Sequence, residues 1–261
     1  MIKISVQNFL GIILLLYAFT GCEVLDYETT DKNNIFHYDD EFYYFVEKIP
    51  DDNAIYNADF AEIYEEEYEP MFVPVFTSEP LPEHIIDFIT DVTFHDNTPF
   101  PHSFLAYLTV THVDFDGQSR IGHMIVADEI ALEVLDIFQE IYEAGFPIYS
   151  IRLIDYFNAD DYLSMKANNS SAFNFRYIAN TNRISRHGFG MAIDVNPIQN
   201  PYVRGDVVLP AAGRQYLNRD DVRPGMIVRG DAVYEAFISR GWIWGGNWTL
   251  PRDYHHFEKR P

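Results

Sequence analysis

Residues 185–194 read Ser-Arg-His-Gly-Phe-Gly-Met-Ala-Ile-Asp, and residues 253–258 read Asp-Tyr-His-His-Phe-Glu. Together they contain the side chains of a catalytic metal site. A catalytic zinc ion takes three protein ligands from His, Asp, Glu or Cys and keeps a fourth position open for water. His187, Asp194 and His256 could provide these ligands. Asp253 lies one turn-like step before His256, so it is the candidate general base that takes a proton from the water.

Two glycines separate the first two candidate ligands. Gly188 and Gly190 permit backbone turns that other residues resist, so His187 and Asp194 can converge on one point. The spacing differs from the helical His-Glu-x-x-His motif, which excludes that group of metalloproteases. A single histidine is more often structural than metal-binding, and the prediction therefore rests on the clustering of these residues.

The two motifs resemble those of the D-alanyl-D-alanine carboxypeptidase and dipeptidase family of zinc peptidases, which also includes phage L-alanyl-D-glutamate endolysins. This resemblance implies one zinc ion per chain, bound by His187, Asp194 and His256, with Asp253 as the general base. His255 stands where relatives usually have another residue, so we expect a neighbour of the site rather than a ligand. Segments 172–176, 196–202 and 241–248 are similar to a bacterial lipoprotein branch of the family, which extends the resemblance to about residues 100–261.

The family also uses an arginine on the substrate side, where a fixed cation binds substrate and stabilises the oxyanion. Arg176 is the first candidate and Arg152 is its competitor, because the Gly-Tyr-Arg segment of better-known members is missing here. A purely structural ion pair is the alternative for either arginine. Ser185 and Asn196 are expected to orient His187 and Asp194 as residues behind the ligands.

The resemblance implies hydrolysis of peptidoglycan stem peptides, with D-alanyl-D-alanine carboxypeptidase or dipeptidase activity first and L-alanyl-D-glutamate endopeptidase activity second. The alternative from another class is a non-catalytic, metal-containing lipoprotein that binds the cell wall. The presence of Asp253 argues against that alternative, because a structural metal site has no need of an extra carboxylate. A serine or cysteine hydrolase is excluded, since the chain has no Gly-x-Ser-x-Gly elbow and its one cysteine lies near the N-terminus.

The composition of the 261 residues excludes further classes of function. The formal net charge is −22, and no basic stripe is present, which argues against nucleic-acid binding. Acidic wall polymers would be repelled in the same way. With 48% hydrophobic residues, the chain can bury one substantial core.

The N-terminal region has the features of a bacterial lipoprotein signal peptide. Lys3 precedes an apolar stretch at residues 9–19, too short for a membrane span of about twenty residues. Residues 19–22 read Phe-Thr-Gly-Cys and resemble a lipobox, so residues 1–22 are predicted to be a lipoprotein signal peptide that ends at Cys22, the cysteine that would be lipidated and become the mature N-terminus. The alternatives are an ordinary signal peptide or an uncleaved anchor. We therefore expect an exported protein, anchored by lipid to the periplasmic or cell-surface side of a bacterial membrane.

Residues 23–70 are acidic and rich in tyrosine, and we interpret them as a tether between the anchor and a zinc peptidase domain at residues 71–261. No Asp-x-Asp-x-Asp-Gly loop supports a calcium site there, so a solvated charged surface is the favoured interpretation. Since Cys22 is the only cysteine, the exported domain has no disulfide and depends on its core and its metal.

Hydrophobic patterning predicts an α+β domain, a small antiparallel sheet flanked by helices, with the zinc in a groove. The resemblance implies the D-Ala-D-Ala peptidase or hedgehog-like fold. We expect a hairpin at 105–126 with its turn at 116–117, a helix capped by Asp128 and ended by Gly145, a strand at 148–154 and a helix from Asp231. Trp242 is expected in the core, whereas Trp244 or Trp248 could line the cleft.

Overall fold

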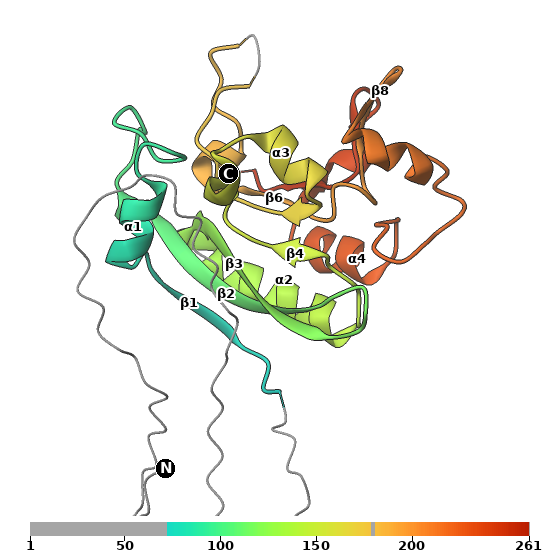
Figure 1. The fold of residues 1–261 in the computed structure, drawn as a ribbon, viewed down its shortest axis with the longest axis horizontal. Helices are drawn as coiled ribbons and strands as arrows, with labels where there is room; N and C mark the ends of the chain where they lie inside the picture. Colours follow the sequence, from blue (N-terminus) through green and yellow to red (C-terminus); the bar gives the residue numbers. More distant parts are fainter. Residues whose placement is uncertain (1–71, 179–180, 261) are drawn as a thin grey trace, which may run out of the picture. The chain divides into compact units, whose positions relative to one another are not determined.

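The computed structural model describes residues 72–178 and 181–260. Its first sheet has the strand order β1-β2-β3, formed by β1 (Phe76–Pro80), β2 (Leu105–Val113) and β3 (Ser119–Ala127), all antiparallel (Figure 1). The predicted hairpin is confirmed as β2 and β3, and its turn contains Gly117 with φ +77°. Helix α1 (Glu83–Ile89) lies between β1 and β2 in the chain. The predicted signal peptide with Cys22 and the predicted tether lie outside the described residues.

Helix α2 (Ala131–Glu143) packs its apolar side on this sheet and into the main core. The predicted helix is confirmed, and it ends before Gly145, whose φ is +66°. Two details of the prediction are wrong. Asp128 lies inside a 3-10 turn, Asp128–Ile130, and no side-chain capping bond is formed at its start or at the start of α2. The apolar residues between 130 and 142 predict one buried stripe that includes Leu132, but Leu132 is 74% exposed.

The strand predicted at 148–154 is much shorter in the structure. Strand β4 (Ser150–Ile151) pairs in parallel with β5 (Asn169–Ser170), which is equally short. The amide of Asn169 bonds to both the backbone N–H and the carbonyl of Arg152, so a side chain replaces the next rung of the ladder. The chain then enters a 3-10 turn at Ile154–Phe157 and helix α3 (Asp161–Lys166).

Two further three-stranded antiparallel sheets complete the fold. Strand β11 (His256–Glu258) is central in one, between β6 (Ala192–Asp194) and β9 (Ile243–Trp244). The other has the order β10-β7-β8, formed by β10 (Arg252–Asp253), β7 (Tyr202–Arg204) and β8 (Val207–Leu209). Helix α4 (Ala232–Ile238) begins as predicted, because the Asp231 side chain accepts a bond from the Tyr234 N–H at 2.7 Å.

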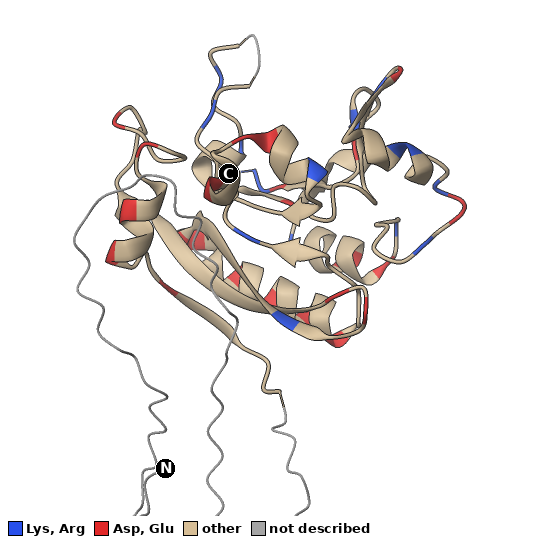
Figure 2. Cartoon of the chain, in the orientation of Figure 1, with Lys and Arg blue, Asp and Glu red and all other residues tan. Residues whose placement is uncertain are grey.

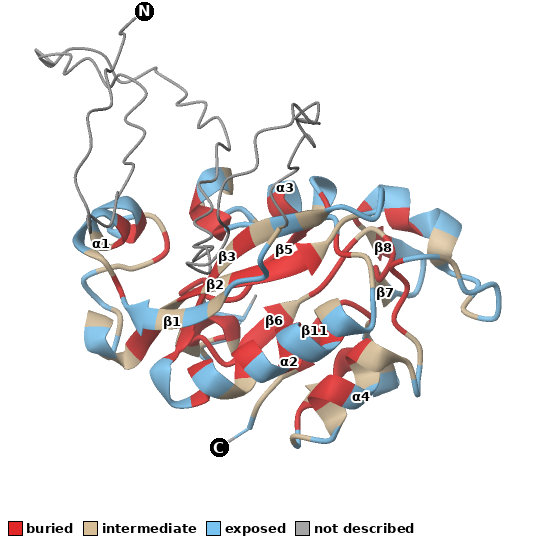
Figure 3. Cartoon of the chain, turned by 90° about the horizontal axis from the view of Figure 1, so that it is seen from below, coloured by how far each residue is buried: buried red, intermediate tan, exposed pale blue. Residues whose placement is uncertain are grey.

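The main core joins α2 and the first sheet to α4 and to the inner faces of β6, β9 and β11, where Ile193, Trp244 and Phe257 are buried (Figure 3). A smaller cluster packs α1 against Leu105, Ile125 and Phe173. The mixture of helices and small antiparallel sheets confirms the α+β class. No helix within residues 72–178 and 181–260 is both long and apolar enough to cross a membrane.

Candidate metal centre

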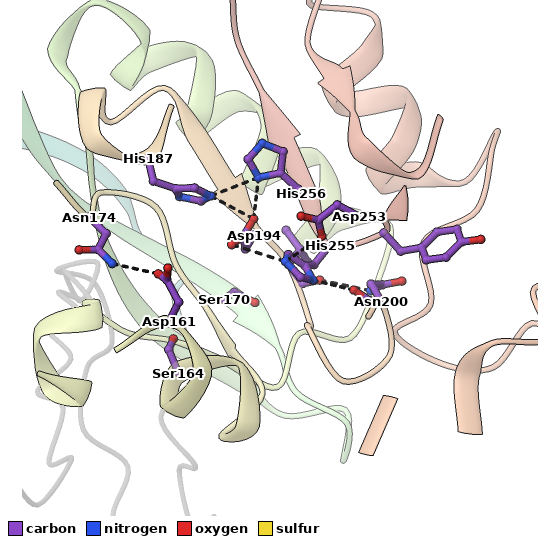
Figure 4. A network of polar contacts seen from close by, with 12 residues as sticks. Asp161, Ser164, Ser170, Asn174, His187, Asp194, Asn200, Asp253, His255 and His256 are labelled. Carbon is purple, nitrogen blue, oxygen red and sulfur yellow. Dashed lines mark hydrogen bonds and ion pairs between the residues drawn. The ribbon is translucent and has the colours of Figure 1, made fainter. Parts of the chain in front are cut away.

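The structure brings His187, Asp194 and His256 together as a group that could hold a metal ion (Figure 4). Asp194 ends β6 and His256 begins β11, and the two residues are direct partners in the antiparallel register. His187 starts a short 3-10 turn, His187–Phe189, just before β6. Two paired strands and one turn therefore place three ligand side chains that are up to 69 positions apart in sequence.

The distances between the three ligand atoms test whether a metal fits. His187 Nε2 lies 3.2 Å from His256 Nδ1 and 3.2 Å from Asp194 Oδ1, and His256 Nδ1 lies 3.0 Å from Asp194 Oδ1. A tetrahedral ion with bonds of about 2.0–2.1 Å separates its ligand atoms by about 3.3–3.4 Å. The triangle is within a few tenths of an ångström of that size, so one ion fits with small side-chain movements.

The outer nitrogen of each histidine has a partner that turns the other nitrogen toward the triangle. His187 Nδ1 is 2.6 Å from the carbonyl oxygen of Ala172, and because a carbonyl can only accept, Nδ1 carries the proton. His256 Nε2 lies 3.5 Å from a carboxylate oxygen of Glu258. These contacts leave the lone pairs of His187 Nε2 and His256 Nδ1 free for a metal, as is usual for metal-binding histidines.

Gly190 allows the sharp backbone turn between His187 and Asp194. Its φ is +65°, a conformation that L side chains rarely adopt, and a Cβ there would lie 2.5 Å from the backbone nitrogen of Ala127. The Gly190 carbonyl accepts a hydrogen bond from that same N–H at 2.9 Å. The glycine thus lets the first motif lie directly against the end of β3.

Asp253 and His255 form a pair beside the candidate ligands. His255 Nε2 is 2.9 Å from Asp253 Oδ1 and 3.7 Å from Asp194 Oδ2, while its Nδ1 donates to the Asn200 carbonyl at 2.8 Å. His255 Nδ1 is thus engaged by a carbonyl, and its Nε2 is closer to Asp253 than to Asp194, in agreement with its expected place as a neighbour. Asp253 is near the centre, but its oxygen contacts this imidazole directly.

The electrostatics of the centre favour a bound cation. Burial alone would raise the pKa of Asp194, but the charges of His187 and His255 and the contacts with His187 and His256 lower it well below 3.8. Burial alone would lower the pKa of His256, but Asp194 and Glu258 outweigh it and raise the pKa to about 10. Asp253 and Asp194 likewise outweigh burial at His255 and raise its pKa to about 9. A metal ion can take the place of the proton at His256.

The centre lies in a pocket of about 860 Å³. Its wall includes Asp253, Glu258 and the aromatic side chains of Tyr202 and Trp248. The Trp248 ring centroid is 5.4 Å from that of His256. Trp242 and Trp244 are buried in the core, which confirms the expectation for Trp242 and assigns the cleft to Trp248 rather than Trp244.

The two candidate arginines are separated by the structure. Arg176 lines the pocket, and its Nε is 2.5 Å from a carboxylate oxygen of Asp161, the first residue of α3. Arg152 is exposed and is not part of the pocket wall. Its backbone follows β4 and is held by the Asn169 amide. The structure thus places Arg176 and not Arg152 in the pocket wall, and the role of a substrate-side cation stays a prediction.

The two residues expected behind the ligands behave differently. Ser185 Oγ accepts a hydrogen bond from the backbone N–H of His187 at 3.3 Å, which agrees with an orienting role. Asn196 does not contact the His187 or Asp194 side chains. Its oxygen accepts from Tyr149 N–H, and its amide donates to the carbonyls of Pro147 and Gly225. The prediction for Asn196 is therefore wrong, since this buried side chain holds three backbone segments together.

Three contacts of the centre were not predicted from the sequence. The carbonyl of Ala172 and the carboxylate of Glu258 orient the two ligand histidines, and the carbonyl of Asn200 orients His255. Glu258 had a usable signal, because residues two apart in a strand lie on the same face and Glu258 follows His256 by two. The contacts of the Ala172 and Asn200 carbonyls could not be predicted in this way, because every residue has a backbone carbonyl and the residue type does not show which one contacts a histidine.

Comparison with known families gives one match. Residues 179–259 match the family described as D-alanyl-D-alanine carboxypeptidase. No curated protein and no solved structure matched significantly. The matched range contains all three candidate ligands and Asp253, whereas Arg176 lies just before it. The resemblance drawn from the two motifs is thus confirmed over residues 179–259, the part of the chain that matches the D-alanyl-D-alanine carboxypeptidase family of peptidases.

Proposed function

We propose that this chain is a zinc peptidase that cuts the peptide stems of peptidoglycan, with the D-alanyl-D-alanine bond as its preferred substrate. The observation that carries the proposal is the ligand triangle of near-tetrahedral size, in a pocket that also contains Asp253, a carboxylate that is not one of the three candidate ligands. The family match over residues 179–259 supports peptidase chemistry at the level of the family.

His187, Asp194 and His256 would hold the ion, and Ala172 and Glu258 keep the two imidazoles in the required orientation. Bound zinc would polarise the scissile carbonyl and lower the pKa of a water molecule to about 7. Asp253 accepts the proton of that water and returns it to the departing amine. His255 holds the Asp253 carboxylate at 2.9 Å and so limits its rotation.

Arg176 is the residue proposed to bind negative charge on the substrate. Its side chain is 36% exposed and lines the pocket, and its partner Asp161 is also exposed to solvent. A guanidinium at such a place suits a terminal carboxylate, because it forms two parallel hydrogen bonds with one. This favours removal of a terminal residue or dipeptide over cleavage within the stem, such as at an L-alanyl-D-glutamate bond.

The proposal is tested with purified protein that lacks residues 1–22. It is incubated with defined stem pentapeptides, and the products are identified by mass spectrometry. We expect loss of the terminal D-alanine or release of D-alanyl-D-alanine only if zinc is present, and Asp253→Asn should lower kcat by about 10²–10⁴-fold with zinc still bound. Zinc-loaded protein that cuts no stem peptide would favour the wall-binding lipoprotein instead, and a cut between L-alanine and D-glutamate would favour the endopeptidase.

We also propose that the protein is exported and held on a bacterial membrane by lipid on Cys22. Peptidoglycan lies outside the cytoplasm, so an exported location agrees with the proposed substrate. The support is the apolar segment at residues 9–19 followed by the lipobox-like residues 19–22.

A further inference from the structure

The pocket differs in charge from the chain as a whole. The sequence has 18 Lys and Arg against 40 Asp and Glu, but the pocket wall contains four arginines and four carboxylates. Figure 2 shows the same contrast, with acidic positions along α1 and α2 and basic positions on both arms of the hairpin between residues 176 and 185. The pocket is therefore a place where an anion meets less repulsion than elsewhere on this protein.

Two of the four arginines have a carboxylate partner in the pocket wall. Arg176 pairs with Asp161 at 2.5 Å, and Arg260 pairs with Glu258 at 3.1 Å. The two other carboxylates, on Asp194 and Asp253, belong to the metal centre and contact its histidines.

Arg183 and Arg186 are the remaining two arginines. Within residues 72–178 and 181–260, neither forms an ion pair with a carboxylate, and both line the pocket. Arg183 is exposed and Arg186 is half-buried. Two arginines thus line the pocket without a carboxylate partner among the described residues.

The backbone holds these two residues firmly although their side chains lack anionic partners. The Arg183 carbonyl accepts a bond from the Ile178 N–H at 2.8 Å, across the hairpin. The Arg186 carbonyl accepts bonds from the N–H groups of Phe189 and Met191, and His187 follows directly. The turn that places a candidate metal ligand therefore also fixes the position of Arg186.

We propose that Arg183 and Arg186 form an anion subsite, which binds a carboxylate of an acidic peptide substrate away from the bond that is cut. This rests on the proposed peptidase function and specifies its substrate class: a peptide with at least one free carboxylate besides the terminal one. Arginine suits this role, since its planar guanidinium binds carboxylates in a two-point geometry and stays charged. These two arginines would also reduce the electrostatic repulsion between an acidic peptide and a chain whose net charge is −22.

The test uses two stem pentapeptides that differ at one group. One keeps the free α-carboxylate of its γ-linked D-glutamate, and the other carries an amide there. Binding is measured by calorimetry to zinc-loaded Asp253→Asn protein, and KM and kcat are measured with the unmodified enzyme. We expect the acidic peptide to bind about tenfold more tightly, with the difference in KM rather than kcat, and weaker at high salt.

Arg183→Gln and Arg186→Gln should each reduce the preference for the acidic peptide, and the double variant should abolish it. Arg214→Gln is the matched control, because Arg214 is exposed, lies outside the pocket wall and bonds only to the Asp206 carbonyl in the described residues. Zinc content is measured for every variant, since Arg186 is next to His187. If Arg186→Gln loses zinc, Arg183→Gln alone decides the result.

The outcomes separate this inference from the proposed function. Cleavage of both peptides with equal KM, unchanged in the arginine variants, overturns the subsite and leaves the peptidase standing. Arginine-dependent binding of the acidic peptide without any cleavage supports the subsite and overturns the peptidase. Stronger competition by inorganic phosphate than by glutarate would mean that the arginines bind phosphate, which overturns the assignment to a carboxylate.

Discussion

At the residue scale, two adjacent histidines in the C-terminal motif make different contacts. In strand β11, His256 turns Nδ1 toward His187 and Asp194, which lie 3.2 and 3.0 Å away, while Nε2 of His255 lies 2.9 Å from Asp253 and 3.7 Å from Asp194. Nδ1 of His255 donates to the Asn200 carbonyl, so only His256 presents a nitrogen to both other corners of the triangle. Both are almost completely buried, which means that exposure does not distinguish them.

The first prediction contrasts these two histidines. His256→Ala removes a corner of the triangle and should lower zinc affinity by more than about a hundredfold, because changes behind the ligands alone cost about 10–100-fold. His255→Gln should lower affinity by about tenfold or less but reduce kcat, since Asp253 loses its partner. Zinc is measured by competition with a chromophoric chelator. Equal losses in the two variants would contradict the assignment of His256 alone.

The second prediction concerns the two arginines. Arg176→Gln should lower kcat/KM by about 10–100-fold, mainly through KM, because a charge-assisted contact with the substrate is lost. Arg152→Gln should leave kcat/KM unchanged within about twofold, since Arg152 lies outside the pocket wall. A purely structural Arg176–Asp161 pair would instead produce a lower Tm with unchanged kcat/KM, and circular dichroism melts of both variants test this.

At the scale of elements, the site depends on how short segments approach one another. Strand β6 has three residues and β11 has three, yet their register sets Asp194 opposite His256. Such short strands are stabilised by packing rather than by length, and Ile193 and Phe257 alternate with the site residues and are fully buried. The face of the sheet opposite the metal centre is thus part of the main core.

Gly190 is where β3 and the first motif touch, and a third prediction follows. Gly190→Ala should destabilise the fold by about 2 kcal/mol or more, since strain at a positive φ adds to a clash with the backbone of β3. Gly117→Ala is the control, because its φ is also positive but a Cβ there meets nothing within 4 Å. Gly117→Ala should lower the free energy of unfolding by only about 1–2 kcal/mol. Urea unfolding measures both, and equal losses would contradict the contact with β3.

Asp155 links the 3-10 turn at 154–157 to Thr93, whose hydroxyl donates to it at 2.7 Å. Burial raises the pKa of Asp155 from 3.8 to about 6. The folded state therefore holds this proton more tightly, so its stability falls relative to the unfolded state as pH rises from about 4 to about 6, and the loss is complete above the folded pKa.

The fourth prediction follows from this loss of stability with rising pH. Asp155→Asn keeps an acceptor for the Thr93 hydroxyl and removes the ionisation. The variant should gain stability relative to the parent as pH rises from 4 to 7.5, by up to roughly 3 kcal/mol. Urea unfolding at several pH values measures the difference. A difference that stays constant with pH would show that Asp155 ionises normally in the folded protein.

At the scale of the whole molecule, an acidic chain carries a pocket of balanced charge. We expect the net charge of −22 to repel phosphate backbones, while the proposed anion subsite in the pocket would accept acidic peptides. The proposed lipid anchor would hold this pocket at a membrane surface, near newly exported peptidoglycan.

The fifth prediction tests that anchor. Cys22→Ser should abolish incorporation of labelled palmitate in bacterial cells and move the protein from the membrane fraction to the soluble exported fraction. Peptidase activity in extracts should be unchanged, because residues 185–258 carry the metal centre. Membrane association that persists in Cys22→Ser would point to an uncleaved anchor, and cleavage without lipid in the parent would point to an ordinary signal peptide.

The residue types and spacing of two short motifs were enough to predict the family and to name the candidate ligands, because metal chemistry restricts which side chains can serve. Hydrophobic patterning predicted the α+β class. Local patterning likewise predicted the β2–β3 hairpin and α4, where the turn residue and the cap lie within the element. The length of β4, by contrast, depends on the Asn169 side chain, which comes from a distant part of the chain.

Only the tertiary structure placed Arg176 and not Arg152 in the pocket wall, placed Trp248 and not Trp244 in the cleft, and showed that Asn196 serves the backbone. The physical reason is that a side chain's role depends on which other segments pack beside it. The residues of a motif within one segment are held near one another by the chain itself. The carbonyls of Ala172 and Asn200, by contrast, reach the metal centre only after the sheets have formed.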